Sequence, residues 1–378
     1  MPANHATRIK TALCSAVLAL TVSVPPAGAL ATGPLHTTDC GWQVVSSRTV
    51  TAAESQRYRS SDPDFPTLAA VDALSDTNVW IIGQSIEHWN GSKWRVYKPA
   101  GVGRYRNLDI KTLDAIAAVS PTDIWAVGGE LYGSLIDHWN GKSWAKVRSP
   151  GSDFLSAVAV SPLGDVWAAG GKVYSHGEDE AWVDHWTGTR WTGMVAEPPE
   201  TDIPSGLTSI APLAPHDVIA GDVDGASMQW NGASWTATPT PIEILALAPL
   251  SPTNVWAAGW RGTAHWDGSS WTQADLALPS GWIPNLKSVS AAGPNDIWAV
   301  GEMDEFNSQT HEEIGHRALV VHWNGTEWTR RSAASLHAEY KRFDGISTLP
   351  NGDARMVGTM RITKKGGPLP LIEHYSAC

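Results

Sequence analysis

A histidine- and glutamate-rich stretch carries the most suggestive chemistry in this sequence. Residues 311–316 read His-Glu-Glu-Ile-Gly-His. Two imidazoles with a glutamate between them can bind Zn²⁺ and activate water when both rings share one face of a helix. That arrangement needs histidines four positions apart, whereas His311 and His316 are five apart. We therefore interpret the stretch as a solvated acidic loop, and we expect no metal, no cofactor and no catalytic residue there.

Two loops could supply the paired carboxylates of glycosidic bond cleavage. The segment 171–183 contains Glu178, Asp179 and Glu180, and the segment 302–318 contains Asp304 and Glu312. Paired acidic side chains can act as acid and base, or as acid and nucleophile, on a sugar. A glycoside hydrolase or lyase therefore remains an alternative, although we expect a protein without enzymatic activity.

Tryptophan is abundant because it belongs to a repeat. The chain has 21 Trp and only four Phe. Most of the tryptophans recur in the phrase Asp-Ile-Trp-Ala-Val-Gly, followed later by His-Trp-Asn-Gly-x-x-Trp. Copies of the first half begin at Asn78, Asp123, Asp165, Asp217, Asn254, Asp296 and, in degenerate form, Asp353. Aromatic side chains at a repeated position are typical of packing between repeats, so we assign these tryptophans to the core.

Three tryptophans fall outside the repeat, and we expect them on loops of one face. Aromatic rings stack on the C–H faces of sugars, and nearby carboxylates accept hydrogen bonds from hydroxyl groups. The predicted ligand-binding residues are Trp182, Trp260, Trp282, Tyr174, Glu178 and Asp179.

Each copy of the repeat reads as four short strands. In the copy around Asp123, the apolar run 113–119 suits an inner strand, and Ser-Pro-Thr-Asp forms the turn that follows it. A second strand covers 124–128, a third ends at Trp139 before an Asn-Gly hairpin signal, and a fourth begins at Trp144. Seven copies of this length predict an all-β chain, a seven-bladed β-propeller over residues 32–378.

The two chain ends complement each other. The last copy, residues 343–378, stops after its third strand, and residues 39–48 match the missing fourth. We expect the N-terminal strand to complete the C-terminal blade and so to close the ring. Cys40 and Cys378 fall on the same turn position of the repeat, which predicts a disulfide bond between them.

The N-terminus has the order of a secretory signal peptide. Within residues 1–31, Arg8 and Lys10 precede the apolar run 11–24, and small residues follow. We therefore expect a secreted, extracellular monomer without membrane insertion. The net charge of −11 argues against nucleic acid as a partner, because such binding needs basic residues to neutralise phosphates.

On these residues, the chain resembles secreted bacterial β-propeller repeat proteins of the actinobacterial type. The Gly-x-x-Trp ending of the hairpin, as in Gly91 to Trp94 and Gly141 to Trp144, resembles the Asp-box turn of sialidase-like propellers. The Ser or Thr that opens a true Asp-box is absent. The tryptophan-rich blades are similar to those of lectin propellers, whereas the Gly-His and Trp-Asp signature of WD40 repeats is missing. The resemblance implies the fold, and it implies lectin-like binding only as an expectation.

Together these patterns favour a secreted binding module that recognises carbohydrate or a cell-surface glycan through loops on one propeller face. The expected partner is a glycan or a surface protein. Besides the hydrolase or lyase, a second alternative is a protein-interaction scaffold without a small ligand.

Overall fold

The computed structural model describes residues 40–45, 68–83, 85–100, 112–130, 133–172, 180–198, 206–222, 224–307, 313–362 and 367–377. Strands, turns and loops make up these residues, which contain no helix. Accordingly, none of the described residues belongs to a helix of the length and hydropathy needed to span a membrane. The prediction of an all-β chain is confirmed for this part. The predicted signal peptide, residues 1–31, lies outside it.

The strands pair antiparallel in sets of four, and we call each set a blade. The first strands are β2 (Leu68–Ser75), β6 (Thr112–Ser120), β10 (Phe154–Val160), β14 (Leu207–Ala214), β18 (Glu243–Ser251), β22 (Trp282–Gly293) and β26 (Tyr340–Thr348). The second strands are β3 (Asn78–Gly83), β7 (Asp123–Glu130), β11 (Val166–Lys172), β15 (Asp217–Asp222), β19 (Asn254–Trp260), β23 (Asp296–Phe306) and β27 (Ala354–Arg361). The third strands are β4 (Ile86–Trp89), β8 (Gly133–Trp139), β12 (Glu180–Trp186), β16 (Ala226–Trp230), β20 (Gly262–Trp266), β24 (Glu313–Trp323) and β28 (Leu369–Ser376). The fourth strands are β5 (Trp94–Tyr97), β9 (Trp144–Val147), β13 (Trp191–Val195), β17 (Trp235–Pro239), β21 (Trp271–Ala274), β25 (Trp328–Arg330) and, for the blade that ends in β28, β1 (Gly41–Val44).

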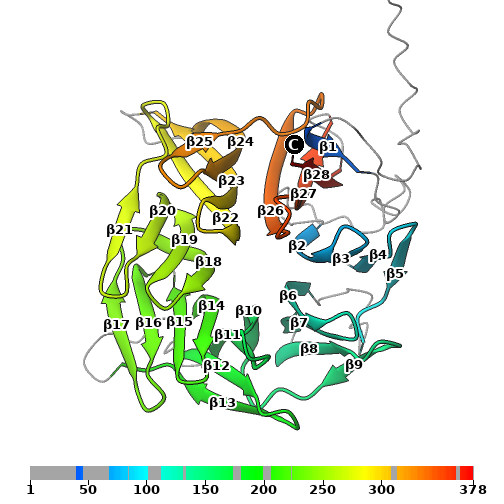
Figure 1. Ribbon diagram of the computed structural model, residues 1–378, viewed down its shortest axis with the longest axis vertical. Coiled ribbons are helices and arrows are strands. Elements are labelled where there is room, and N and C mark those ends of the chain that lie inside the picture. Colours follow the sequence, from blue (N-terminus) through cyan, green and yellow to red (C-terminus); the bar gives the residue numbers. More distant parts are fainter. Residues whose placement is uncertain are drawn as a thin grey trace, which may run out of the picture.

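The blades follow one another around a common centre, with their first strands innermost and their fourth strands at the outer edge (Figure 1). Each first strand contacts the first strand of the next blade, and β26 contacts β2. Side chains tie these inner strands together. The backbone N–H of Ala118 donates to Asp72 Oδ2 at 2.7 Å, and that of Ala73 donates to Ser347 Oγ at 3.0 Å. This arrangement is a β-propeller.

A tryptophan and a histidine form the repeated core of the blades. The ring of Trp80, only 1% exposed, stacks on His88 with centroids 4.0 Å apart. His88 Nε2 lies 2.8 Å from Asn78 Oδ1, the residue that opens the repeat. The same ring contact recurs in Trp125–His138, Trp167–His185, Trp256–His265 and Trp298–His322. The assignment of the second-strand tryptophans to the core is confirmed.

The Asn-Gly of the repeat forms the hairpin between the third and fourth strands. Asn90 Oδ1 accepts hydrogen bonds from the backbone N–H groups of Ser92 and Lys93. Gly91 has φ +85°, and a Cβ at that position would lie 2.8 Å from Thr77. Both the positive φ and the close approach require glycine, which explains why the pair recurs.

The N-terminal strand joins the last blade. Gly41 pairs with Ser376 and Val44 with Glu373, so β1 is shorter than the predicted strand 39–48. Trp42 packs edge-on against Trp298 with centroids 5.4 Å apart. Cys40 directly precedes this pairing. Because Cys378 lies outside the described residues, the disulfide stays a prediction.

Two segments expected to be loops contain strand residues at both of their ends. In the segment 171–183, β12 begins at Glu180, which places Trp182 within a strand. In the segment 302–318, β23 continues to Phe306 and β24 starts at Glu313, which corrects the interpretation of His316 as part of a solvated loop. The expectation failed because Glu302 and Asp304 are buried beside His316, and Asp184 is buried as the partner of Trp182.

Candidate binding sites

Trp182 is part of the packing of its own blade. Its indole N–H donates to Asp184 Oδ1 at 2.6 Å, and Asp184 is fully buried. The ring rests against the backbone of Gly193 on β13, and the Lys172 ammonium lies 5.2 Å from its centre. These contacts account for the tryptophan without a ligand.

Trp260 and Trp282 lie on neighbouring blades, near the point where β19 meets β22. Trp260 ends β19 and pairs with Asn285 of β22, and its ring is 6.4 Å from Phe306. Trp282 begins β22 and lies under the guanidinium of Arg317 at 4.7 Å. Two of the three tryptophans thus lie near the contact between β19 and β22, and Trp182 lies in the β10–β13 blade. Tyr174, Glu178 and Asp179 lie outside the described residues.

A cavity of about 360 Å³ lies between the outer part of the β22–β25 blade and the start of β26. One wall is β24 over residues 316–320, and the other walls are residues 330–333 and 338–341. We call it the β24 cavity. The cavity was not predicted from the sequence.

The edge of β24 at this cavity is only partly paired. β24 pairs with β25 at Val321, His322 and Trp323 alone, and Arg331 N–H adds a bond to Val320 C=O. Because the hydrogen-bonding groups of a strand alternate in direction, those of Ala318 and His316 face the same edge as those of Val320. Among the described residues, no backbone group pairs with them there. Such an edge can accept an extended peptide as a further strand.

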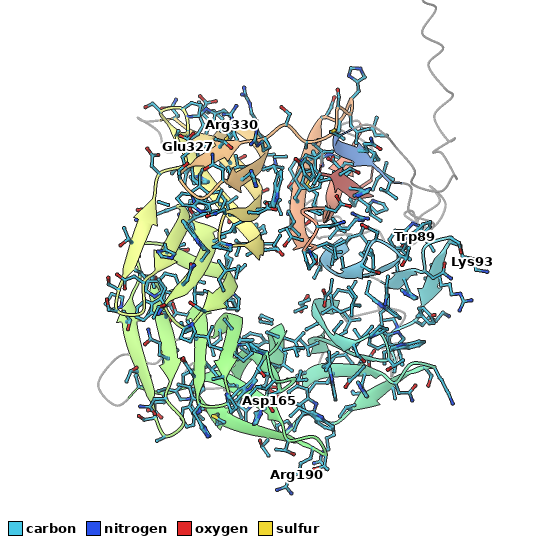
Figure 2. The ribbon with its side chains drawn as sticks, in the orientation of Figure 1. Trp89, Lys93, Asp165, Arg190, Glu327 and Arg330 are labelled. Atoms are coloured by element: carbon cyan, nitrogen blue, oxygen red, sulfur yellow. The ribbon has the colours of Figure 1, made fainter. Side chains whose placement is uncertain are left out.

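Basic side chains surround the cavity. Arg330 and Arg331 line it and are exposed, and neither guanidinium forms an ion pair within the described ranges. Lys341 contacts the buried Glu373, with Nζ 3.5 Å from Oε1. Figure 2 labels Arg330 on the β22–β25 blade. In a chain of net charge −11, these arginines mark a place suited to carboxylates, which guanidinium groups bind in a bidentate manner.

A network of buried charges supports the cavity wall. His316 Nδ1 lies 3.0 Å from Asp304 Oδ1, and its Nε2 lies 3.6 Å from Glu302 Oε2. The His316 ring stacks on Tyr340 of β26, with centroids 4.5 Å apart. Glu302 also lies 3.8 Å from the Lys287 ammonium. The network ties β24 to the neighbouring blade and holds its side chains in place.

Burial and charge shift the pKa values in this network. Burial raises the pKa of Glu302. Asp344, whose Oδ1 lies 3.0 Å from Arg342 Nε, is close enough to interact with the charges of Glu302 and Lys287, and burial raises its pKa to about 6. Burial alone would lower the pKa of His316, but the hydrogen bond with Asp304 and the charge of Glu302 outweigh it and raise this pKa. Folding therefore makes the imidazolium form of His316 more favourable than it is for an ordinary histidine.

Asp304, Glu313 and His316 are also the kinds of residue that bind metals. One ligand atom from each lies within 4.8 Å of the others. Asp304 and His316 already contact each other directly at 3.0 Å, and Glu313 is exposed. A hydrogen-bonded ion pair accounts for this grouping without a metal.

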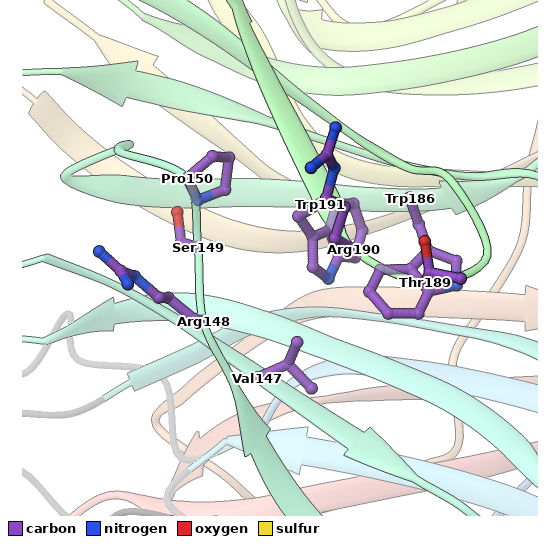
Figure 3. A pocket seen from close by; sticks show the side chains of 8 residues that line it. All are labelled: Val147, Arg148, Ser149, Pro150, Trp186, Thr189, Arg190 and Trp191. Atoms are coloured by element: carbon purple, nitrogen blue, oxygen red, sulfur yellow. The ribbon is translucent and has the colours of Figure 1, made fainter.

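A second cavity, of about 350 Å³, lies at the outer edge between the β6–β9 and β10–β13 blades (Figure 3). Val147 and Pro150 form one wall, and Trp186 and Trp191 of the β12–β13 hairpin form the other. One arginine comes from each wall, and Figure 3 shows these side chains, Arg148 and Arg190. We call it the rim cavity.

The sequence does hold a signal for the β24 cavity. The fourth strand of that repeat copy reads Trp-Thr-Arg-Arg, and β25 ends at Arg330. The equivalent β13 continues for five residues, to Val195. A short fourth strand beside two arginines could have indicated an uncovered edge, although the repeat pattern alone does not show where pairing stops.

No family model matches the chain. A search of curated proteins likewise finds no match.

Solved structures with the same fold do match. The structure of U3-55K aligns with a TM-score of 0.57 at 12% identity, covering 88% of this chain and 98% of that one. The WD40 β-propeller domain of Doa1 aligns with a TM-score of 0.53 at 11% identity, covering 84% and 95%. YCF48 bound to D1 peptide aligns with a TM-score of 0.53 at 12% identity, covering 90% and 97%. At such identities the similarity shows the propeller fold alone.

Proposed function

We propose that this protein is a protein-interaction scaffold that binds an extended, acidic segment of a partner protein in the β24 cavity. The observation that carries the proposal is the unpaired edge of β24 beside arginines that have no ion pair among the described residues. The edge offers main-chain hydrogen bonds, and the arginines offer specificity for carboxylates.

Three further features support a polypeptide as the ligand. Ile314, on the same strand, is 59% exposed, and an apolar side chain of a partner could cover it. A fold neighbour, YCF48, was solved bound to a peptide, which shows that this fold can hold one. The supporting network of His316 and Tyr340 keeps the wall rigid, which reduces the entropy lost on binding.

The scaffold takes the place of the carbohydrate hypothesis. That hypothesis needed Trp182 and Trp260 as open stacking platforms. The ring of Trp182, however, rests on Gly193, and its indole N–H is bonded to Asp184. Of the three tryptophans, Trp282 contacts Arg317, a residue that lines the β24 cavity. We therefore assign Trp282 the role of orienting the Arg317 guanidinium.

We also propose that the four-strand sets are seven blades, that β1 closes the ring and that Cys40 and Cys378 form a disulfide in a secreted monomer. The register of Gly41 with Ser376 and the contact of β26 with β2 support closure. Non-reducing peptide mapping of the secreted chain should recover the Cys40–Cys378 pair. Recovery of both cysteines as free thiols would refute the disulfide.

A peptide selection tests the proposed function. Peptides selected on the purified chain from a random library should be rich in Asp and Glu, and R330S/R331S should weaken their binding at least about tenfold. The matched control is Arg261→Asn, which removes an exposed arginine elsewhere. Arg261 has φ 78°, a conformation that Asn tolerates. Enrichment of glycans on an array, with no peptide selected, would contradict the proposal.

A further inference from the structure

The outer edge of three consecutive blades is strongly basic. This edge consists of the strands β5, β9 and β13, the hairpin turn before each strand and the few residues after it. Residues 90–100, 140–151 and 187–196 contain no Asp or Glu. Their basic residues are Lys93, Arg95, Lys98, Lys142, Lys146, Arg148 and Arg190, and all seven are exposed. We call these residues the basic rim, and Figure 2 shows Lys93 and Arg190 at the outer perimeter.

Protection of exposed strand edges against unwanted pairing does not explain this positive charge. Lysines on an exposed edge prevent unwanted strand pairing. If that were their purpose here, every outer strand would need them. The outer strands β17 and β21 contain no Lys or Arg, and residues 267–276 around β21 include Asp267 and Asp275. The positive charge is therefore not a general property of the outer strands, and β5, β9 and β13 carry it together on consecutive blades.

Apolar surface accompanies the charge. The rim cavity opens between Arg148 and Arg190, and its walls include Val147, Pro150 and Trp186. Val96, within the basic rim, is 48% exposed. A partner that contacted only the charged side chains would leave this apolar surface exposed to solvent.

The aromatic rings of the rim do not suit nucleic-acid bases or sugars. Trp191 is only 5% exposed, and Trp186 packs against both Trp191 and Trp125. Stacking requires an open ring face, which these contacts take up. An amino-acid side chain entering the cavity needs only an apolar wall.

We propose that the basic rim is a second interaction surface, which binds an acidic polypeptide segment whose apolar side chain enters the rim cavity. Carboxylates on either side of that side chain meet Arg148 and Arg190, and further acidic residues follow Lys142 and Lys93 around the edge. The basic rim lies on different blades from the β24 cavity, so this proposal can be tested independently of the proposed function.

The experiment uses the full chain carrying R330S/R331S, so that the β24 cavity does not contribute. The probe is a fluorescein-labelled peptide, Gly-Glu-Glu-Leu-Glu-Glu-Gly, and fluorescence anisotropy measures its dissociation constant at low salt. We expect binding that weakens about tenfold in K93Q/R148Q/R190Q, and that weakens as salt rises. T236Q/T272Q, at exposed positions of β17 and β21, is the matched control and should have no effect.

Two peptide variants and two competitors complete the test. Replacing Leu by Gly should weaken binding several-fold, and replacing every Glu by Gln should abolish it. Absence of binding, or binding that K93Q/R148Q/R190Q leaves unchanged in a folded protein, would overturn the proposal. A heparin oligosaccharide or single-stranded DNA that bound more tightly than the peptide would overturn its assignment to an acidic polypeptide.

Discussion

The β10–β13 and β22–β25 blades share an interior and differ at their outer strands. In both, a buried tryptophan of the second strand packs against a histidine of the third, as Trp167 against His185 and Trp298 against His322. The outer strand β13 covers β12 from Trp182 to Trp186, and the bond from Ala196 N–H to Ala181 C=O extends the pairing. By contrast, β25 covers only the last three residues of β24.

The comparison indicates that different parts of a blade provide stability and binding. The repeated tryptophan and histidine fix the blade, whereas the length of the fourth strand decides whether an edge is free for a partner. Where the fourth strand is long, an additional tryptophan such as Trp182 becomes part of the packing. Where it is short, the same edge lies beside Arg330 and Arg331.

The largest expected effect tests the shared interior. Trp167→Ala and Trp298→Ala should each lower the free energy of unfolding by about 3–5 kcal/mol, because each removes a large ring that is nearly fully buried. Urea denaturation measures both. A loss below about 1 kcal/mol for either would show that the two interiors are not equivalent.

Trp182→Ala should cost less, about 2–4 kcal/mol, because the ring is half-buried and its removal leaves the Asp184 carboxylate without one donor. Trp182→Phe separates the two contributions, since it keeps most of the ring and removes only the donor. Unchanged stability in Trp182→Ala would mean that the ring is available for a ligand after all.

Much of this architecture could be predicted from the sequence. The turn, the second-strand tryptophan and the Asn-Gly hairpin each follow from local chemistry, as Asp123, Trp125 and Asn140 illustrate, so the propeller and its core were predicted. The candidate site was not, because it depends on where pairing stops and on which charges are buried together. Nothing local to His316 or Glu302 indicates that they meet across a hairpin and pack against Tyr340.

The two blades should also differ, by a smaller amount, in how their histidines make stability depend on pH. The pKa of His316 is raised above its ordinary 6.5, so its extra stabilisation is complete below pH 6.5 and is lost as pH rises through the folded-state pKa. Burial lowers the pKa of His185, so that side chain destabilises the folded protein as pH falls below 6.5. The stability difference between wild type and His316→Gln should therefore shrink from pH 6 to pH 8. The free energy of unfolding of the wild type should fall relative to that of His185→Gln as pH falls. Urea midpoints across this range measure both, and parallel curves would contradict the assigned pKa directions.

The smallest expected effect concerns the arginines. R330S/R331S should change the free energy of unfolding by no more than about 0.5 kcal/mol, because both side chains are exposed and make no ion pair in the described part of the chain. Thermal denaturation measures it. A loss of several kcal/mol would assign these arginines to the fold and not to a partner.

The measurement that tests the central claim most directly is amide hydrogen exchange with a selected peptide. The edge amides of β24 at His316 and Ala318 should exchange readily in the free chain and become protected when the peptide binds. Amides of β12 between Trp182 and Trp186, already paired with β13, should show no change. Peptide binding without protection at His316 and Ala318 would contradict strand addition at the β24 edge.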